Sequence, residues 1–225
     1  MTLTGLSAYL ATNILQRPEL ANTAELTVAI NAGHLQLQMD GDFRCMEKHV
    51  IVTVPANTIE GVAIAADYKR ARHVWNTLAG VRTSPVTPAV ESEINLLALT
   101  AKQTRGLDSL TTGNGYYQRW FERELKLCLL IPPAASTNLL VDYYAYLPDY
   151  AAPTDSDYFS TYYWLCLLYC AAWQASLTMF EDSRASLFQQ TYATLLKQAI
   201  ANDQGIKEGG KKSMGEAAAA PTGGK

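Results

Sequence analysis

Charge is missing from the longest apolar stretch of this 225-residue sequence, because residues 158–180 contain no Asp, Glu, Lys or Arg. Histidine is scarce, with three residues, and the strings H-E-x-x-H, C-x-x-C and G-x-S-x-G are absent. These absences argue against a zincin, a thioredoxin-like oxidoreductase and a nucleophile-elbow hydrolase. A G-x-x-x-x-G-K string begins at Gly205, but Lys212 stands where a Walker motif needs Ser or Thr. We therefore expect no enzyme, no catalytic residues and no cofactor.

A basic excess is also lacking. The formal net charge is −3, so no general positive field is available to wrap nucleic acid. Residues 205–225 depart from this balance with four lysines and two glutamates. The remaining body is therefore mildly acidic and is expected to repel DNA.

Cysteines are few and scattered, at positions 45, 128, 166 and 170. The N-terminus lacks the charged-then-apolar pattern of a signal peptide, so we expect a reducing compartment without a disulfide framework. Cys166 and Cys170 lie one helical turn apart, a possible soft-metal pair. Two ligands do not complete a tetrahedral zinc site, so buried thiols explain the pair better and no metal is expected.

The uncharged stretch 158–180 is predicted to be one helix. Its apolar residues recur every three or four positions, and the opposite side is apolar too. Such a helix must be covered by lipid, by its own chain or by neighbouring subunits. Four tyrosines and acidic flanks weigh against lipid, so we expect a helix buried between subunits. The residues predicted to be core or subunit contacts are Tyr162, Trp164, Leu168, Trp173 and Leu177.

Further helices are predicted at both ends of the chain. Residues 5–16 form the first, and residues 22–40 form a second with a capping-box-like start at Asn22 and Glu25. Leu26, Ile30, Gly33 and Leu37 share the buried edge of the second helix. A last helix from near Asp182 to residue 202 follows the apolar one, and two such successive helices favour an antiparallel pair.

The middle of the chain has the period of β-strands. Strands are predicted at 50–54, 67–76 and 116–121, with a hairpin at 124–146 that turns at Pro132 and Pro133. Pro85 and Pro88 are expected to bracket a loop, residues 89–99 a short helix and residues 100–115 a polar loop. The fold class is α+β. We expect N-terminal bundle helices at 1–41, a β-rich extension at 42–148, a C-terminal helical pair at 149–203 and a flexible arm at 204–225.

Three clusters leave alternatives open. Lys69, Arg70, Arg72 and His73 form a basic patch that faces phosphate or is a solvated strand edge. The aromatic clusters 143–146 and 158–169 are base-stacking platforms or else core or subunit interface, and the lack of interleaved Lys or Arg favours core or interface. Aspartates 149, 155 and 157 are a carboxylate cluster or, as we favour, a solvated loop that caps the next helix. The arm has too little apolar surface to fold alone; it is a floppy terminus or it orders on a partner.

The order of these segments carries a resemblance. It consists of the helix 22–40 entering Phe43-Arg44 and the strand 50–55, then Tyr116-Tyr117, the hairpin 125–148 and the helices 158–180 and 181–202. In this order the chain resembles the head-to-tail adaptor (connector) proteins of tailed bacteriophages, especially of short-tailed phages. The resemblance covers residues 5–203. The sequence departs from the family pattern in the polar segment 89–115 and in the C-terminal tail.

The resemblance implies a structural virion protein. It implies a ring, of twelve copies, docked under the portal protein at the head–tail junction, with double-stranded DNA passing non-specifically through its channel. Assembly in the host cytoplasm and contact with the next tail protein, a nozzle or tail tube, are implied as well. The resemblance also implies a C-terminal arm that reaches the portal. We expect residues 205–225 to be this arm, with contacts at Ile206, Lys207, Lys211, Lys212 and Met214.

Two other classes remain as alternatives. One is a membrane-anchored protein that inserts through residues 158–180, whose length is sufficient to span a bilayer. The other is an enzyme whose site is assembled from residues distant in sequence. A pocket with converging ionisable groups would favour the enzyme.

Overall fold

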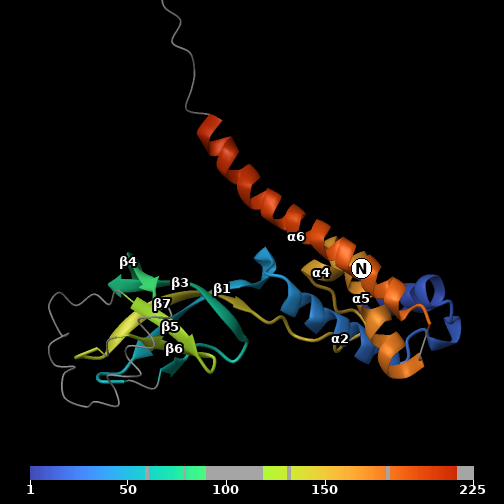
Figure 1. The fold of residues 1–225 in the computed structure, drawn as a ribbon, viewed down its shortest axis with the longest axis horizontal. Helices are drawn as coiled ribbons and strands as arrows, with labels where there is room; N and C mark the ends of the chain where they lie inside the picture. Colours follow the sequence, from blue (N-terminus) through green and yellow to red (C-terminus); the bar gives the residue numbers. More distant parts are fainter. Residues whose placement is uncertain (59–60, 79, 90–118, 131–132, 181–182, 217–225) are drawn as a thin grey trace, which may run out of the picture. The chain divides into compact units, whose positions relative to one another are not determined.

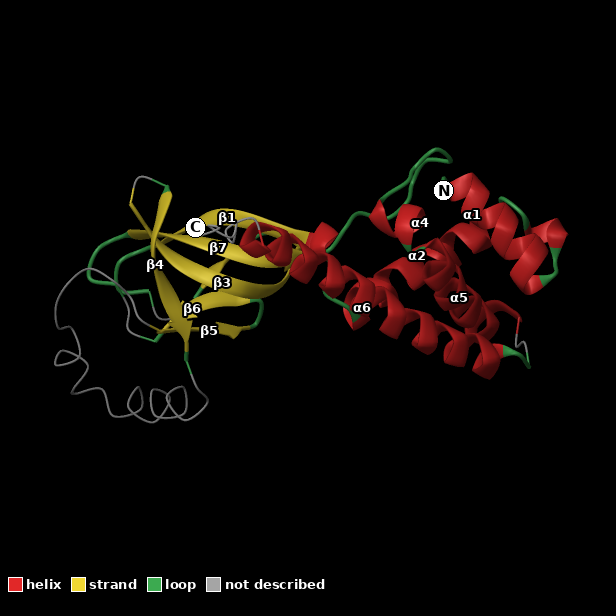
Figure 2. Cartoon of the chain, turned by 90° about the horizontal axis from the view of Figure 1, so that it is seen from above, coloured by secondary structure: helices red, strands yellow, loops and turns green. Residues whose placement is uncertain are grey.

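The computed structural model describes residues 1–58, 61–78, 80–89, 119–130, 133–180 and 183–216, the side chains of 179–180 and 206–216 excepted. The chain forms two compact units (Figure 1). The helical unit comprises residues 1–45 and 147–225, and the β unit comprises residues 46–146. Among the described residues, the α-helices lie in the helical unit and the strands in the β unit; Figure 2 colours helices red and strands yellow. This mixture of helix and sheet confirms the predicted α+β class.

The helical unit begins with α1 (Leu3–Tyr9), which continues as the π-helical turn η1 (Leu10–Leu15), and a 3-10 turn η2 (Pro18–Leu20) follows. The predicted helix 5–16 is thus confirmed. Helix α2 (Ala24–Asp40) begins two residues later than the predicted residue 22, because Thr23 is the N-cap and its hydroxyl accepts a hydrogen bond from the Leu26 amide. Asn22 instead adopts a left-handed φ of 62°.

The predicted continuous helix 158–180 is wrong in one respect. It consists of α4 (Tyr158–Tyr162), α5 (Trp164–Ala175) and the π-helical turn η5 (Ser176–Phe180). The break lies at Tyr163, whose φ of −125° leaves the helical region. This backbone places the Tyr163 ring 5.6 Å from both Phe43 and Tyr158, so aromatic packing accompanies the interruption.

Helix α5 contacts both α2 and α6 (Ala185–Glu216). It approaches α2 closely at Gly33, where a Cβ would lie 2.7 Å from the backbone nitrogen of Ala171. On the α6 side, Trp173 stacks on Tyr192 with ring centroids 6.2 Å apart. Residue 182, the predicted start of this last helix, lies outside the described residues, whereas its end is Glu216 instead of residue 202. The flexible arm predicted at 204–225 is therefore wrong as far as Glu216, because this part continues α6 as helix, and residues 217–225 lie outside the described residues.

The β unit is a seven-stranded sheet in the order β1-β7-β3-β4-β5-β6-β2. A short 3-10 turn, η3 (Arg44–Met46), leads into it from the helical unit. The strands are β1 (Glu47–Val54), β2 (Val62–Ala63), β3 (Tyr68–Leu78), β4 (Val81–Pro88), β5 (Arg119–Arg123), β6 (Lys126–Leu129) and β7 (Thr137–Ala145). Their alternating apolar residues form one core cluster that includes Val52, Val74, Trp120, Leu139 and Val141. Tyr143 and Tyr144 are buried in the sheet.

Two predictions about this sheet are wrong. Strands β6 and β7 do not form a hairpin, because β7 lies between β1 and β3 while β6 pairs with β5 and β2. The hairpin is β5–β6, turned by Glu124 and Leu125 with φ of 52° and 60°, the left-handed pair of a tight two-residue turn. Pro85 and Pro88 lie within β4 and not around a loop, and Pro85 stands opposite Trp75 of β3. The predicted segments at 90–118 lie outside the described residues.

Candidate functional site

The five predicted contact residues fall into three classes of exposure. Leu168 is wholly buried in the helical unit. Trp164 and Trp173 are half-buried, and Trp164 packs edge-on against Tyr9 at 5.1 Å between ring centroids. Tyr162 and Leu177 are 67% and 56% exposed. Leu168 is thus a core residue of the single chain, whereas Tyr162 and Leu177 are surface residues.

Helix α5 obtains most of its cover from its own chain. Seven of its residues are buried: Cys166, Leu167, Leu168, Cys170, Ala171, Ala172 and Ala175. Helices α2 and α6 provide this cover. The apolar character of α5 on all sides is therefore explained within one subunit, and the expectation that it needs neighbouring subunits does not follow from it.

Helix α2 carries a second apolar stripe that the sequence analysis did not identify. Val28, Ala32, Leu35 and Met39 are spaced by four, three and four residues, which places them on one side of the helix. Val28 is 61% exposed, Leu35 46% and Met39 55%. We call these four residues the α2 outer stripe. The opposite side, with Leu26, Ile30, Gly33 and Leu37, is buried as predicted.

A buried polar network joins α2 to the segment that returns from the β unit. His34 is fully buried and its Nε2 lies 2.8 Å from Asp157 Oδ2. Its Nδ1 lies 3.1 Å from the amide nitrogen of Gln38, whose oxygen accepts from the Leu147 amide at 2.6 Å. The Gln38 amide is thereby oriented, so the Nδ1 atom accepts and the Nε2–H donates to the carboxylate.

Asp157 does more than cap α4. It accepts hydrogen bonds from His34, from the Ser160 amide at 2.8 Å and from the Tyr150 hydroxyl at 2.5 Å. Burial acts to raise the pKa of Asp157, but these hydrogen bonds outweigh it and lower the pKa below the ordinary 3.8. The same burial, with Asp157 beside it, raises the pKa of Tyr150. The predicted capping role of Asp157 is confirmed by its capping box with Ser160.

Asp203 anchors α6 to the rest of the helical unit. It is buried, its Oδ2 accepts from the Arg44 amide at 3.0 Å, and its Oδ1 accepts from the Tyr158 hydroxyl at 3.2 Å. Gly205, two residues later, has no atom within 4 Å of where its Cβ would lie. The predicted arm residues Ile206, Lys207, Lys211, Lys212 and Met214 lie on the backbone of α6 beyond this anchor, and their side chains lie outside the described residues.

The cysteines of α5 are buried, and burial raises the pKa of Cys166 to about 12 and raises that of Cys170 as well. Both thiols therefore stay protonated at neutral pH, which disfavours metal binding. Among the described residues no cluster of three His, Cys, Asp or Glu is arranged to hold a metal ion. None of the helices in the described part of the chain is long and apolar enough to cross a membrane.

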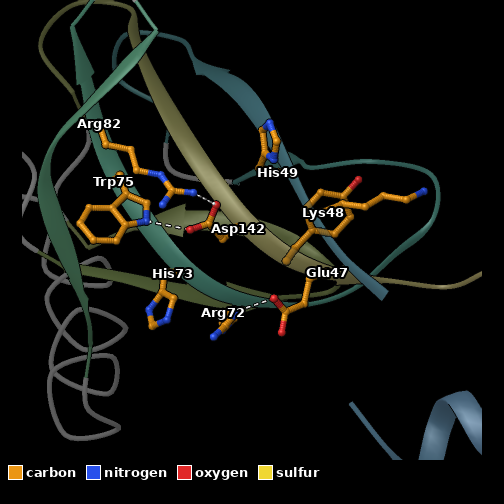
Figure 3. Close-up of a pocket in the computed structure, with 9 residues that line it drawn as sticks. Glu47, Lys48, His49, Arg72, His73, Trp75, Arg82 and Asp142 are labelled. Carbon is orange, nitrogen blue, oxygen red and sulfur yellow. Dashed lines mark hydrogen bonds and ion pairs between the residues drawn. The ribbon is translucent and has the colours of Figure 1, made fainter. Parts of the chain in front are cut away.

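Ionisable side chains converge on one face of the β unit. A cavity of about 400 Å³ is lined by residues of β1, β3, β4 and β7, among them Arg72 and His73 of the predicted basic patch (Figure 3). Arg70 of that patch instead packs over the Tyr144 ring, with the guanidinium carbon 5.6 Å from the centroid. The patch is therefore divided between a cavity and the surface of the sheet.

A search of curated proteins found no match. A family model described as the SU10 adaptor protein matches residues 1–216, which is nearly the whole chain. This match spans both units and agrees with the resemblance carried by the order of the segments. The chain belongs to the SU10 adaptor protein family and is a head-to-tail adaptor of the short-tailed phage type.

Proposed function

We propose that this chain is the subunit of a ring, of twelve copies, that joins the portal to the tail and surrounds the DNA channel. Membership of a phage adaptor family supports a structural role at the head–tail junction of the virion. The observation that carries the ring itself is the α2 outer stripe. Assembly then takes place in the host cytoplasm, and no enzymatic step is required.

The α2 outer stripe has the spacing of a helix–helix seam. Successive steps of four, three and four residues are those of the a and d positions of a coiled coil. Three of its four side chains are about half exposed or more, although exposed apolar residues on a monomer are usually scattered singly. A second copy of the chain, covering Val28, Leu35 and Met39, would bury them by helix packing.

A ring needs two different surfaces on each subunit, one for each neighbour. The α2 outer stripe is the first of them in this proposal. Tyr162 and Leu177, which are exposed on other elements of the helical unit, are the proposed second. Aromatic side chains such as Tyr162 frequently dominate the energy of such contacts.

The portal contact is assigned to α6 beyond Asp203. The helix continues to Glu216 after its last buried anchor. Ile206, Lys207, Lys211, Lys212 and Met214 are the proposed portal contacts, and the β unit is the proposed contact for the next tail protein. The net charge of −3 suits a channel wall along which duplex DNA passes without being held.

The ring is tested with purified portal and the full chain. We expect the chain alone to be a monomer that becomes multimeric on the portal, as measured by native mass spectrometry. Leu35→Lys in the stripe should leave a folded monomer that binds portal without forming a complete ring. Leu187→Lys is the matched control, because Leu187 is also about half exposed, at 56% against 46% for Leu35, but lies on α6. Equal assembly of both variants would contradict the role of the stripe.

The arm is tested by truncation after Gly205. Because Asp203 and its bonds to Arg44 and Tyr158 are retained, the helical unit should stay folded. We expect the truncated chain to lose capture by purified portal. Capture with unchanged affinity would refute the assignment of the arm while leaving the ring proposal intact.

A further inference from the structure

The cavity of the β unit is built from a row of side chains across three strands. His49 of β1 and His73 of β3 are both register partners of Asp142, which lies on β7 between them. Residues paired directly across antiparallel strands point to the same face of the sheet. His49 and His73 are exposed, and Figure 3 shows the imidazoles on either side of the Asp142 carboxylate.

Two arginines of the cavity are held in defined orientations. Arg82 Nη2 lies 2.6 Å from Asp142 Oδ1, and its guanidinium carbon lies 5.3 Å from the centroid of the Trp75 ring. Arg72 Nη1 lies 2.7 Å from Glu47 Oε2. Trp75 completes the coordination of the Asp142 carboxylate by donating from Nε1 to Oδ2 at 2.9 Å.

These ion pairs leave part of each guanidinium group unused. A guanidinium carries five N–H donors in a planar fork, and each of the two ion pairs joins one of its nitrogens to one carboxylate oxygen. Both oxygens of Asp142 are already engaged, one by Arg82 and one by Trp75. The arginines therefore keep donor capacity for a ligand.

The hydrogen-bond donors of the cavity favour an anion. Arg72 and Arg82 face Glu47 and Asp142 in equal number, and Lys48 is paired with Asp67, so the site attracts an anion through unused N–H donors and not through an excess of charge. Arginine forks match the oxygens of a tetrahedral phosphate better than a point charge does. Imidazole N–H groups add donors to the same side.

We propose that this face of the β unit is a phosphate-binding site, with Arg72 and Arg82 as the principal donors and His49 and His73 as flanking donors. Two sources of the phosphate share this chemistry: inorganic phosphate and the phosphodiester backbone of DNA. The ion pairs with Glu47 and Asp142 act in this proposal as supports that orient the arginines before the ligand arrives. The site does not depend on the proposed ring.

The experiment uses the full chain and the histidine ring resonances in NMR spectra. The chain has three histidines, and His34 is buried in the helical unit, so it serves as an internal reference. Titration with inorganic phosphate at constant ionic strength should shift the resonances of His49 and His73 and leave those of His34 in place. A parallel titration with a short DNA duplex identifies the source, because the same two resonances shift only if the backbone also enters.

Variants separate a binding role from a structural one. Arg72→Gln and Arg82→Gln should each weaken phosphate binding at least about tenfold, as expected for the loss of a charged hydrogen-bond donor. Arg82→Lys keeps the charge but not the fork and should retain part of the affinity. Arg123→Gln, an exposed position outside the cavity, is the matched control and should bind as the unmodified chain does.

Unfolding midpoints show whether a variant remains folded. If Arg72→Gln or Arg82→Gln unfolds, phosphate binding is judged from Arg82→Lys and from the titration of the unmodified chain. The site is overturned if neither phosphate nor duplex shifts the His49 and His73 resonances. It is overturned equally if Arg82→Gln and Arg123→Gln bind phosphate alike.

Discussion

The two units of this chain differ in what they leave on their surfaces. The helical unit has eight basic and twelve acidic residues, whereas the β unit has ten basic and nine acidic ones. The helical unit exposes an ordered row of apolar side chains on α2. The β unit gathers ion pairs and histidines on one face of its sheet. Apolar rows favour lasting protein contacts, while oriented cations favour anionic ligands.

The two units also differ in how each obtains its core. In the helical unit the central helix α5 packs against both α2 and α6. In the β unit a single sheet provides the core cluster from its own alternating residues. If each core is self-sufficient, damage to one should leave the other intact.

The largest expected effect tests this independence. Leu139 and Leu168 are both wholly buried, the first in the β unit and the second in the helical unit. Replacing either by Ala should lower the free energy of unfolding of its own unit by about 2–5 kcal/mol. Each unit contains two described tryptophans, so ¹⁹F-labelled tryptophan resonances followed in urea report on the units separately. A variant that shifts both transitions equally would show that the two units unfold as one.

A smaller effect is expected from the close approach of α2 and α5. Gly33→Ala places a Cβ 2.7 Å and 2.9 Å from backbone atoms of Ala171, so the helices must separate, at a cost of about 2–3 kcal/mol. Gly205→Ala is the matched control in α6, where no atom lies within 4 Å; it should stabilise the helix by about 0.5–1 kcal/mol. Urea denaturation measures both, and a neutral Gly33→Ala would contradict the close packing.

The smallest expected effect concerns how sensitive the stability of the helical unit is to acid. Since hydrogen bonds lower the pKa of Asp157 in the folded unit, its stabilisation is complete above the ordinary value of 3.8 and is lost as pH falls toward and through the lower folded pKa. Asp157→Asn should cost about 1.5 kcal/mol at pH 7 and should flatten the decline of helical-unit stability below pH 4. Thermal unfolding from pH 7 to pH 3 measures this, and an unchanged decline in the variant would assign the acid sensitivity to other carboxylates.

Local periodicity predicted the elements better than their partners. The inner edge of α2 and the alternation in β1 and β7 follow from residue spacing, and both were confirmed. The β5–β6 hairpin was missed because Glu124 and Leu125 adopt left-handed backbone without being Gly or Asn, the residues that usually signal such a turn. The prolines after residue 131 suggested the wrong hairpin, since β6 pairs with β5 and β2 instead of β7.

The candidate surfaces depend on information that a local pattern does not contain. The α2 outer stripe repeats the same spacing as the inner edge two residues out of step, so a search for one buried edge passes over it. The cavity needs His49, His73 and Asp142 from three strands, and only their register brings them together. Their sequence separations give no sign of this juxtaposition.

In the sequence, the β unit lies between the two parts of the helical unit, so the chain must bring these distant parts together when it folds. The first strand of the insertion, β1, pairs with its last, β7, and Glu47 stands opposite Tyr144. The entrance and exit of the inserted segment are therefore neighbours. If the sheet forms first, its paired ends hold the two parts of the helical unit as a short link would. The entropy lost on closing the loop of residues 46–146 is then greatly reduced. We expect the pairing of β1 with β7 to speed the assembly of the bundle.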